Sequence, residues 1–205
     1  MGRTPRLALM ASGRGSNVVA ILDAITEGQL AMEAALVMSD QEDAPVLREA
    51  SVRKVPTMVL TPCRGEGRRA YGMRIGEQWG AHGIEVVALA GFMRILAAEV
   101  IEAFPGWIFN IHPSLLPSFP GLHAVRQALD YGVRVSGCTV HRVDAGVDTG
   151  PIILQEAVPV LEDDSEDALA ARILRKEHVL YPRALHLHAE GRLVQQGRKV
   201  RIRND

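Results

Sequence analysis

The clearest indication of the fold is the stretch LALMASGRGSNVVAILDAI at residues 7–25. Its first five residues form an uninterrupted apolar run, which is typical of a strand that is buried on both faces of a parallel sheet. Gly13 and Gly15 then permit a tight turn, and the apolar residues of 17–25 recur at helical spacing. The stretch therefore predicts a strand, a glycine loop and a helix in succession.

The same alternation continues along the chain. Short apolar runs predict further strands at 34–38, 55–60, 85–90, 107–111, 139–143 and 152–158, and helical patterns occupy 68–79, 97–104 and 165–188. We expect Asp163 or Asp164 to cap the last helix and Pro182 to break or kink it. Alternating strands and helices predict an α/β fold, a three-layer Rossmann-like open sheet that is mostly parallel with helices on both faces.

Length and composition predict one ordinary domain over residues 1–205, with flexible ends at 1–5 and 197–205. The 23 basic and 24 acidic side chains nearly cancel, so the net charge favours neither nucleic acid nor a membrane as a partner. The basic residues of the tail are interpreted as a solvated end; they are Arg198, Lys199, Arg201 and Arg203.

Two cysteines, Cys63 and Cys138, suggest neither a disulfide framework nor a zinc site. No apolar stretch approaches the ~20 residues that a membrane-spanning helix needs, and no secretory leader is recognisable. We therefore expect a protein of the reducing cytoplasm.

The glycine loop lies where backbone N–H groups and the helix dipole favour an anion such as phosphate. Val18 rules out a G-x-G-x-x-G dinucleotide motif, and no Gly-Lys-Ser/Thr of an ATP-binding loop follows. An ordinary strand-to-helix turn with Ser or Asn as N-cap explains the pattern equally well.

Asn110 and His112 stand two residues apart at the end of a predicted strand, so both side chains project from one face. An amide N–H₂ beside an imidazolium provides two donors for the oxygen that becomes negative when an amine attacks a formyl carbon. Alternatively, Asn110 caps the strand and His112 is a loop histidine bound by carbonyl groups. Pro113 favours an extended backbone at His112 in either case.

An acidic loop at 144–150 offers a carboxylate to orient this histidine. We favour Asp148 over Asp144, because Asp148 precedes the turn Thr149-Gly150-Pro151. The sequence leaves His141, within a predicted strand, equally compatible with a buried structural role and with a role in the site. A zinc pair of His112 with His141 is disfavoured, since no third ligand is spaced to join them.

Four motifs together resemble the phosphoribosylglycinamide formyltransferases: SGRGSN at 12–17, AGFMRIL at 90–96, NIHPSLLP at 110–117 and DTGP at 148–151. Their order and spacing match that family, and the resemblance covers residues 6–192. It implies transfer of a formyl group from 10-formyltetrahydrofolate to the amine of glycinamide ribonucleotide, without a metal.

The same resemblance implies a role for each matching residue. His112 would be the catalytic acid and base, Asp148 would raise its proton affinity, and Asn110 would hold the oxyanion. The ribonucleotide would be bound by Gly15, Ser16, Asn17 and Glu177. The folate would be bound by Arg68, Met93, Arg94, Ile95, Leu96, Asn110 and Asp144. The expected partners are these two small molecules, bound by a monomer or a homodimer.

One departure from the family pattern is Arg14, where several relatives carry Asn; it adds a positive charge beside the expected phosphate. Methionyl-tRNA formyltransferases and formyltetrahydrofolate hydrolases share the Asn-x-His and Ser-Leu-Leu-Pro features, but they carry further domains for which this length leaves no room. A non-catalytic folate or sugar-phosphate binding module is a third alternative, disfavoured by the intact set of Asn110, His112 and Asp148.

Overall fold

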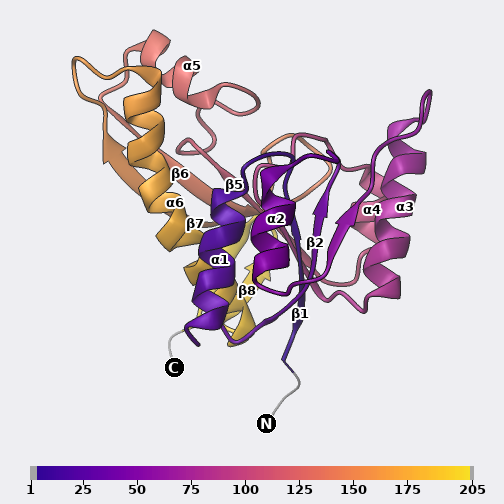
Figure 1. Ribbon diagram of the computed structural model, residues 1–205. Coiled ribbons are helices and arrows are strands. Elements are labelled where there is room, and N and C mark those ends of the chain that lie inside the picture. Colours follow the sequence, from indigo (N-terminus) through magenta and orange to yellow (C-terminus); the bar gives the residue numbers. More distant parts are fainter. Residues whose placement is uncertain (1–3, 204–205) are drawn as a thin grey trace. The chain divides into compact units, whose positions relative to one another are not determined.

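The computed structural model describes residues 4–203 (Figure 1). It contains a seven-stranded sheet in the order β3-β2-β1-β4-β5-β6-β7 and a separate two-stranded sheet of β8 and β9. The strand pairs around β1 are parallel, and β6 pairs with β7 in the antiparallel sense. This architecture confirms the predicted α/β class. The chain divides after Phe109 into two compact units.

In the first unit, β1 (Arg6–Met10) lies between β2 (Glu33–Ser39) and β4 (Val86–Leu89), and β3 (Thr57–Val59) adds to β2. Residues 7–11 are almost fully buried, as the uninterrupted apolar run predicted. Parallel strands of this kind need crossover helices, which the sequence supplies between them.

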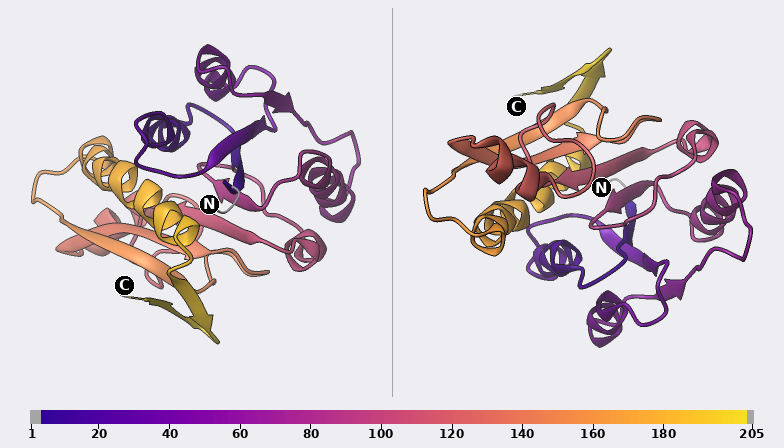
Figure 2. Two further views of the ribbon diagram at one scale, coloured as in Figure 1. Left: turned by 90° about the horizontal axis from the view of Figure 1, so that it is seen from below. Right: turned by 90° about the horizontal axis from the view of Figure 1, so that it is seen from above.

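Four helices belong to this unit: α1 (Ser16–Thr26), α2 (Pro45–Val52), α3 (Arg68–Ala81) and α4 (Ala98–Ala103). Figure 2 shows α1 and α2 on one side of its strands and α3 and α4 on the other. Close packing of α3 on α4 depends on glycine, because a Cβ at Gly76 would stand 2.9 Å from a methyl group of Val100. Trp79 and Phe104 fill the neighbouring space edge to face, with ring centroids 5.1 Å apart.

The second unit begins within β5 (Trp107–His112), whose last residues carry the predicted polar pair. Helix α6 (Glu166–Ala189) packs on β6 (Val135–Arg142) and β7 (Ile152–Pro159), and α5 (Ala124–Tyr131) contacts α6. Strands β8 (Leu193–Gln196) and β9 (Lys199–Ile202) form an antiparallel hairpin.

Several local predictions differ from the structure. Ser165 caps α6 by accepting the backbone N–H of Ala168, so the expected cap at Asp163 or Asp164 is wrong. The helix also continues through Pro182, so the expected break does not occur. One buried face of α6 packs along its length, and this tertiary packing offsets the hydrogen bond that a proline removes.

The chain end also differs from the expected flexible segment at 197–205, because residues 199–202 pair with β8. Their alternation of basic and aliphatic residues, Lys-Val-Arg-Ile, is a strand pattern that the interpretation as a solvated tail overlooked. Helix α5 was not predicted from the sequence. Strand β6 begins at Val135, four residues before its predicted start at 139.

Candidate active site

The polar pair stands where β5 ends, at the entrance to the proline-rich segment. His112 is buried with 5% of its surface exposed, and the intervening Ile111 is also buried. Beyond it, the backbone is held by β6: the Thr139 hydroxyl donates to the carbonyl of Ser114 at 2.7 Å and accepts the N–H of Leu116 at 3.0 Å. The Leu116–Pro117 peptide bond in this segment is cis. The segment after His112 is therefore fixed by buried hydrogen bonds.

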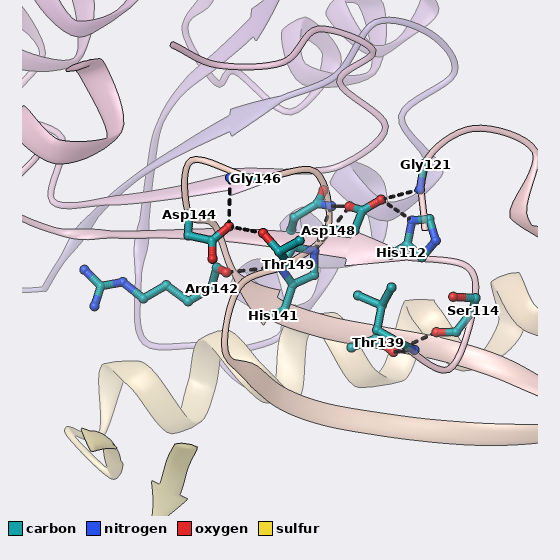
Figure 3. Close-up of polar contacts among 12 residues, drawn as sticks. His112, Ser114, Gly121, Thr139, His141, Arg142, Asp144, Gly146, Asp148 and Thr149 are labelled. Carbon is teal, nitrogen blue, oxygen red and sulfur yellow. Dashed lines mark hydrogen bonds and ion pairs between the residues drawn. The ribbon is translucent and has the colours of Figure 1, made fainter. Parts of the chain in front are cut away.

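Asp148 joins the pair through both of its carboxylate oxygens (Figure 3). Oδ2 lies 3.3 Å from Nδ1 of His112 and accepts the backbone N–H of Gly121 at 2.8 Å. Oδ1 accepts the Asn110 amide at 3.3 Å and lies 3.5 Å from Nε2 of His141. The structure thus brings together the three residues that the sequence proposed, all within the second unit.

The charge of this carboxylate is set by opposing effects. Burial alone would raise the pKa of Asp148, but hydrogen bonds from His141 and Gly121 and the nearby imidazoles outweigh burial and lower it. Asp148 is therefore ionised at neutral pH.

The Asp144 carboxylate forms hydrogen bonds within its own loop. It accepts the backbone N–H of Gly146 at 3.1 Å and the hydroxyl of Thr149 at 2.6 Å. The loop is tight here, because a Cβ at Gly146 would stand 2.0 Å from that hydroxyl oxygen. Asp144 closes the loop that presents Asp148, which supports the sequence-based choice between the two aspartates.

The second ring nitrogen of His112 faces a backbone carbonyl. Nε2 lies 2.8 Å from the oxygen of Phe119, a residue with φ of 54°. The two ring nitrogens of His112 therefore face two oxygens, Nδ1 that of the Asp148 carboxylate and Nε2 that of the Phe119 carbonyl.

His141, whose role the sequence left open, belongs to the same cluster. It is 2% exposed, and its Nδ1 lies 3.0 Å from the carbonyl oxygen of Arg142. Its Nε2 lies 3.2 Å from the amide nitrogen of Asn110 and 3.5 Å from Oδ1 of Asp148. The amide N–H₂ of Asn110 thus faces Asp148 and His141 at long distances, so one N–H can turn to a substrate oxygen at small cost.

The glycine loop of the first unit leads into α1 without a side-chain cap. Gly15 is the N-cap residue, with φ of 69°, so the alternative of a Ser or Asn cap is wrong. A Cβ at Gly15 would stand 2.2 Å from Cγ2 of Val46, whereas one at Gly13 would meet nothing within 4 Å. An uncapped helix start of this kind directs backbone N–H groups outward, as anion sites do.

The residues expected to bind folate lie after β4 and at the start of α3, also in the first unit. Met93 and Ile95 are 64% and 50% exposed, and Arg68 is exposed as the first residue of α3. Arg94 is paired with Asp40, with Nε 2.7 Å from Oδ2. Glu177, expected to contact the ribonucleotide, is buried on α6 in the second unit.

Comparison with known proteins agrees with this arrangement. The model of the formyl transferase family matches residues 5–185. The chain belongs to the formyl transferase family. Among its relatives, the phosphoribosylglycinamide formyltransferase of Bacillus subtilis is 43% identical over 177 residues, which are 86% of this chain and 91% of that protein.

A solved structure is similar over the full length. The glycinamide ribonucleotide transformylase 1 of Symbiobacterium toebii has a TM-score of 0.97 and 50% identity, covering 100% of this chain and 96% of that one. The trifunctional purine biosynthetic protein adenosine-3 of Drosophila melanogaster is 42% identical over 191 residues. That match covers 92% of this chain but only 14% of the Drosophila protein.

Sequence reasoning missed two features of this formyl transferase cluster, the carbonyl of Phe119 and the N–H of Gly121. Both are backbone groups, which carry no residue-type pattern. The sequence named His141 but left its role open, because its contact with Asn110 is seen only in the structure. Within residues 4–203, no group of three or more His, Cys, Asp or Glu could hold a metal ion, and no helix is long and apolar enough to cross a bilayer.

Proposed function

We propose that this protein transfers the formyl group of 10-formyltetrahydrofolate to the amine of glycinamide ribonucleotide, giving formylglycinamide ribonucleotide and tetrahydrofolate. The reaction is the one for which the Bacillus subtilis relative is named, and purine biosynthesis is the role named for the Drosophila relative. The observation that carries the proposal is the convergence of Asn110, His112 and His141 on the two oxygens of Asp148.

The chemistry follows from the groups in the cluster. The amine of the ribonucleotide attacks the formyl carbon, and the formyl oxygen becomes an oxyanion that accepts the amide N–H of Asn110. His112 takes the proton that the attacking amine loses and returns a proton to N10 of the folate as the carbon–nitrogen bond breaks. The charge of Asp148 stabilises the imidazolium that forms between these two steps.

Binding of the two substrates is assigned to separate segments. The ribonucleotide phosphate is held by Gly15, Ser16 and Asn17 at the start of α1, and Glu177 contacts the ribose. The residues assigned to the folate in the first unit are Arg68 and the loop that contains Met93, Arg94, Ile95 and Leu96. Those assigned to it in the second unit are Asn110 and Asp144. Exposed apolar side chains at Met93 and Ile95 suit a flat pterin ring.

We also propose how the chain is organised, where it works and what it binds. Residues 1–205 act as one formyltransferase domain, because the family match at 5–185 extends over both compact units. The protein works in the cytoplasm, consistent with the free thiols of Cys63 and Cys138. It acts on two small molecules as a monomer or homodimer.

The test is a formyl transfer assay with the purified protein and both substrates. Formation of tetrahydrofolate should require glycinamide ribonucleotide and should produce an equal amount of formylated ribonucleotide. Equal release of tetrahydrofolate and formate without the ribonucleotide would instead indicate a hydrolase. Binding of both substrates without turnover would indicate a binding module.

A further inference from the structure

A buried acid stands at the end of β2, outside the cluster of Asp148. Asp40 follows the last residue of that strand and is only 3% exposed. Burial of a carboxylate is unfavourable unless charged or polar partners compensate for the lost water. Its partners are Nε of Arg94 at 2.7 Å and Nε2 of Gln41 at 3.0 Å, both on Oδ2.

The Arg94 partner comes from the loop after β4, 54 residues further along the chain. Its guanidinium carbon also lies 5.6 Å from the ring centroid of Tyr71, on α3. The Tyr71 hydroxyl in turn donates to the carbonyl of Leu60 at 2.6 Å, which fixes the ring. Arg94 is therefore held between a buried charge and an immobilised aromatic face.

Ser12 binds the same loop by its backbone and by its side chain. Its N–H donates to the carbonyl of Gly91 at 3.0 Å, and its hydroxyl oxygen accepts the N–H of Met93 at 2.9 Å. Burial raises the pKa of the Asp40 carboxyl, but its polar neighbours Ser12, Arg94 and Gln41 more than compensate and lower it. Ser12 thus holds the loop at Met93, while Asp40 holds it at Arg94.

This anchoring explains how the loop can present apolar groups to solvent. Met93 and Ile95 are exposed, while Phe92 and Leu96 on either side are buried. Without a fixed backbone, the exposed pair would gain free energy by turning inward. The Arg94–Asp40 ion pair and the hydrogen bond from Met93 to Ser12 hold the loop backbone while these two side chains remain exposed.

We propose that Asp40 is a positioning residue for the folate, which fixes the loop of Met93–Leu96 through Arg94 and so determines affinity for the formyl donor. The inference rests on the proposed function, because it takes this loop to be the folate site. Asp40 is 3% exposed and acts through Arg94 in this proposal, and no binding role was expected of it from the sequence.

The decisive variant is Asp40→Asn, which keeps the size of the side chain and removes its charge. We expect KM for 10-formyltetrahydrofolate and Kd for tetrahydrofolate, measured by calorimetry, to rise about tenfold, the effect of losing a charge-assisted hydrogen bond. KM for the ribonucleotide and kcat at saturating folate should change less than about twofold. Equal rises in both KM values, or an unchanged Kd for tetrahydrofolate, would overturn the proposal.

Two further variants complete the design. Asp23→Asn removes the same charge from a carboxylate that binds Arg53 on the surface of α1, and should leave all four constants unchanged. Combining Asp40→Asn with Arg94→Gln should cost no more folate affinity than the larger single effect, because the two residues act as one unit. Additive losses would contradict action through Arg94.

The readouts also separate this inference from the proposed function. If wild-type protein binds tetrahydrofolate but formylates no ribonucleotide, the proposed reaction fails while the calorimetric test of Asp40 still applies. If transfer is normal and Asp40→Asn binds tetrahydrofolate as the wild type does, only the positioning role fails. Should Asp40→Asn prove too unstable to assay, Asp40→Glu retains the charge in a displaced position and should raise the same Kd by a smaller factor.

Discussion

Oδ2 of Asp148 lies 3.3 Å from Nδ1 of His112 while the backbone of Asp148 has φ of 53°, in the left-handed region. This conformation is uncommon for a residue other than glycine, although Asp and Asn adopt it more readily than most. The closed loop around Asp144 maintains it, with Thr149 and Gly146 bound to the Asp144 carboxylate. The conformation of this loop therefore places the Asp148 carboxylate beside His112.

The charge of Asp148 can be removed without altering its backbone. Asp148→Asn should fold normally, because Asn tolerates the left-handed conformation, but kcat should fall about 10²–10⁴-fold since His112 loses the group that stabilises its charged form. The pH profile of kcat should change as well, because the carboxylate is ionised in the wild type throughout the neutral range. Asp130→Asn, in an exposed pair with Arg126, is the matched control and should behave as wild type. Retention of the wild-type profile by Asp148→Asn would reject the coupling.

Truncation of the polar pair should damage turnover much more than folding. Asn110→Ala should lower kcat about 10²–10³-fold by removing an oxyanion donor, and His112→Ala about 10²–10⁴-fold by removing the acid and base. Thermal unfolding measured beside the kinetics should show only a modest change in Tm. His186→Ala removes an imidazole that pairs with Glu190 on α6 and should leave kcat unaffected. Wild-type rates in either truncated variant would exclude the assigned roles.

The glycine loop gives a pair of substitutions of which only one should lower stability. Gly15→Ala places a Cβ against Val46 at a positive φ, so it should destabilise by about 1–2 kcal/mol for the backbone conformation alone and should raise the ribonucleotide KM. Gly13→Ala meets no atom within 4 Å, and its stability should match the wild type. Val46→Ala removes the methyl group 2.2 Å away but keeps Cβ 2.6 Å away, so adding it to Gly15→Ala should recover only a small part of the loss. Equal denaturant midpoints for the two single variants would contradict this account.

Acid stability should depend on Asp164. Hydrogen bonds from Arg172 and from the backbone of Leu161 lower the pKa of Asp164 to about 2, below the ~3.9 of an unfolded chain. A group with a depressed folded pKa stabilises above the unfolded value, and that contribution disappears as pH falls toward 2. Asp164→Asn should therefore be less stable than wild type at pH 7, and the difference should shrink between pH 4 and pH 2. Urea unfolding at several pH values measures it; a constant difference would be incompatible with the ion pair.

The sequence by itself determined the α/β class and the positions of most central elements, because uninterrupted apolar runs and helical periodicity are local properties of the chain. It also placed Asn110 and His112 on one face, since alternation along a strand needs no knowledge of the neighbours. The turn residues after Asp148 favoured it over Asp144, but the sequence alone did not separate the two aspartates.

Tertiary structure decided which groups meet. His141 joins Asn110 across 31 residues, and Arg94 joins Asp40 across 54, and neither pairing leaves a periodic signal in the sequence. The backbone groups of Phe119 and Gly121 that bind His112 and Asp148 are invisible to any pattern of residue types. Hydrogen bonds between distant segments depend on how strands are ordered and loops are closed, and that order is fixed only when the chain buries its apolar surface.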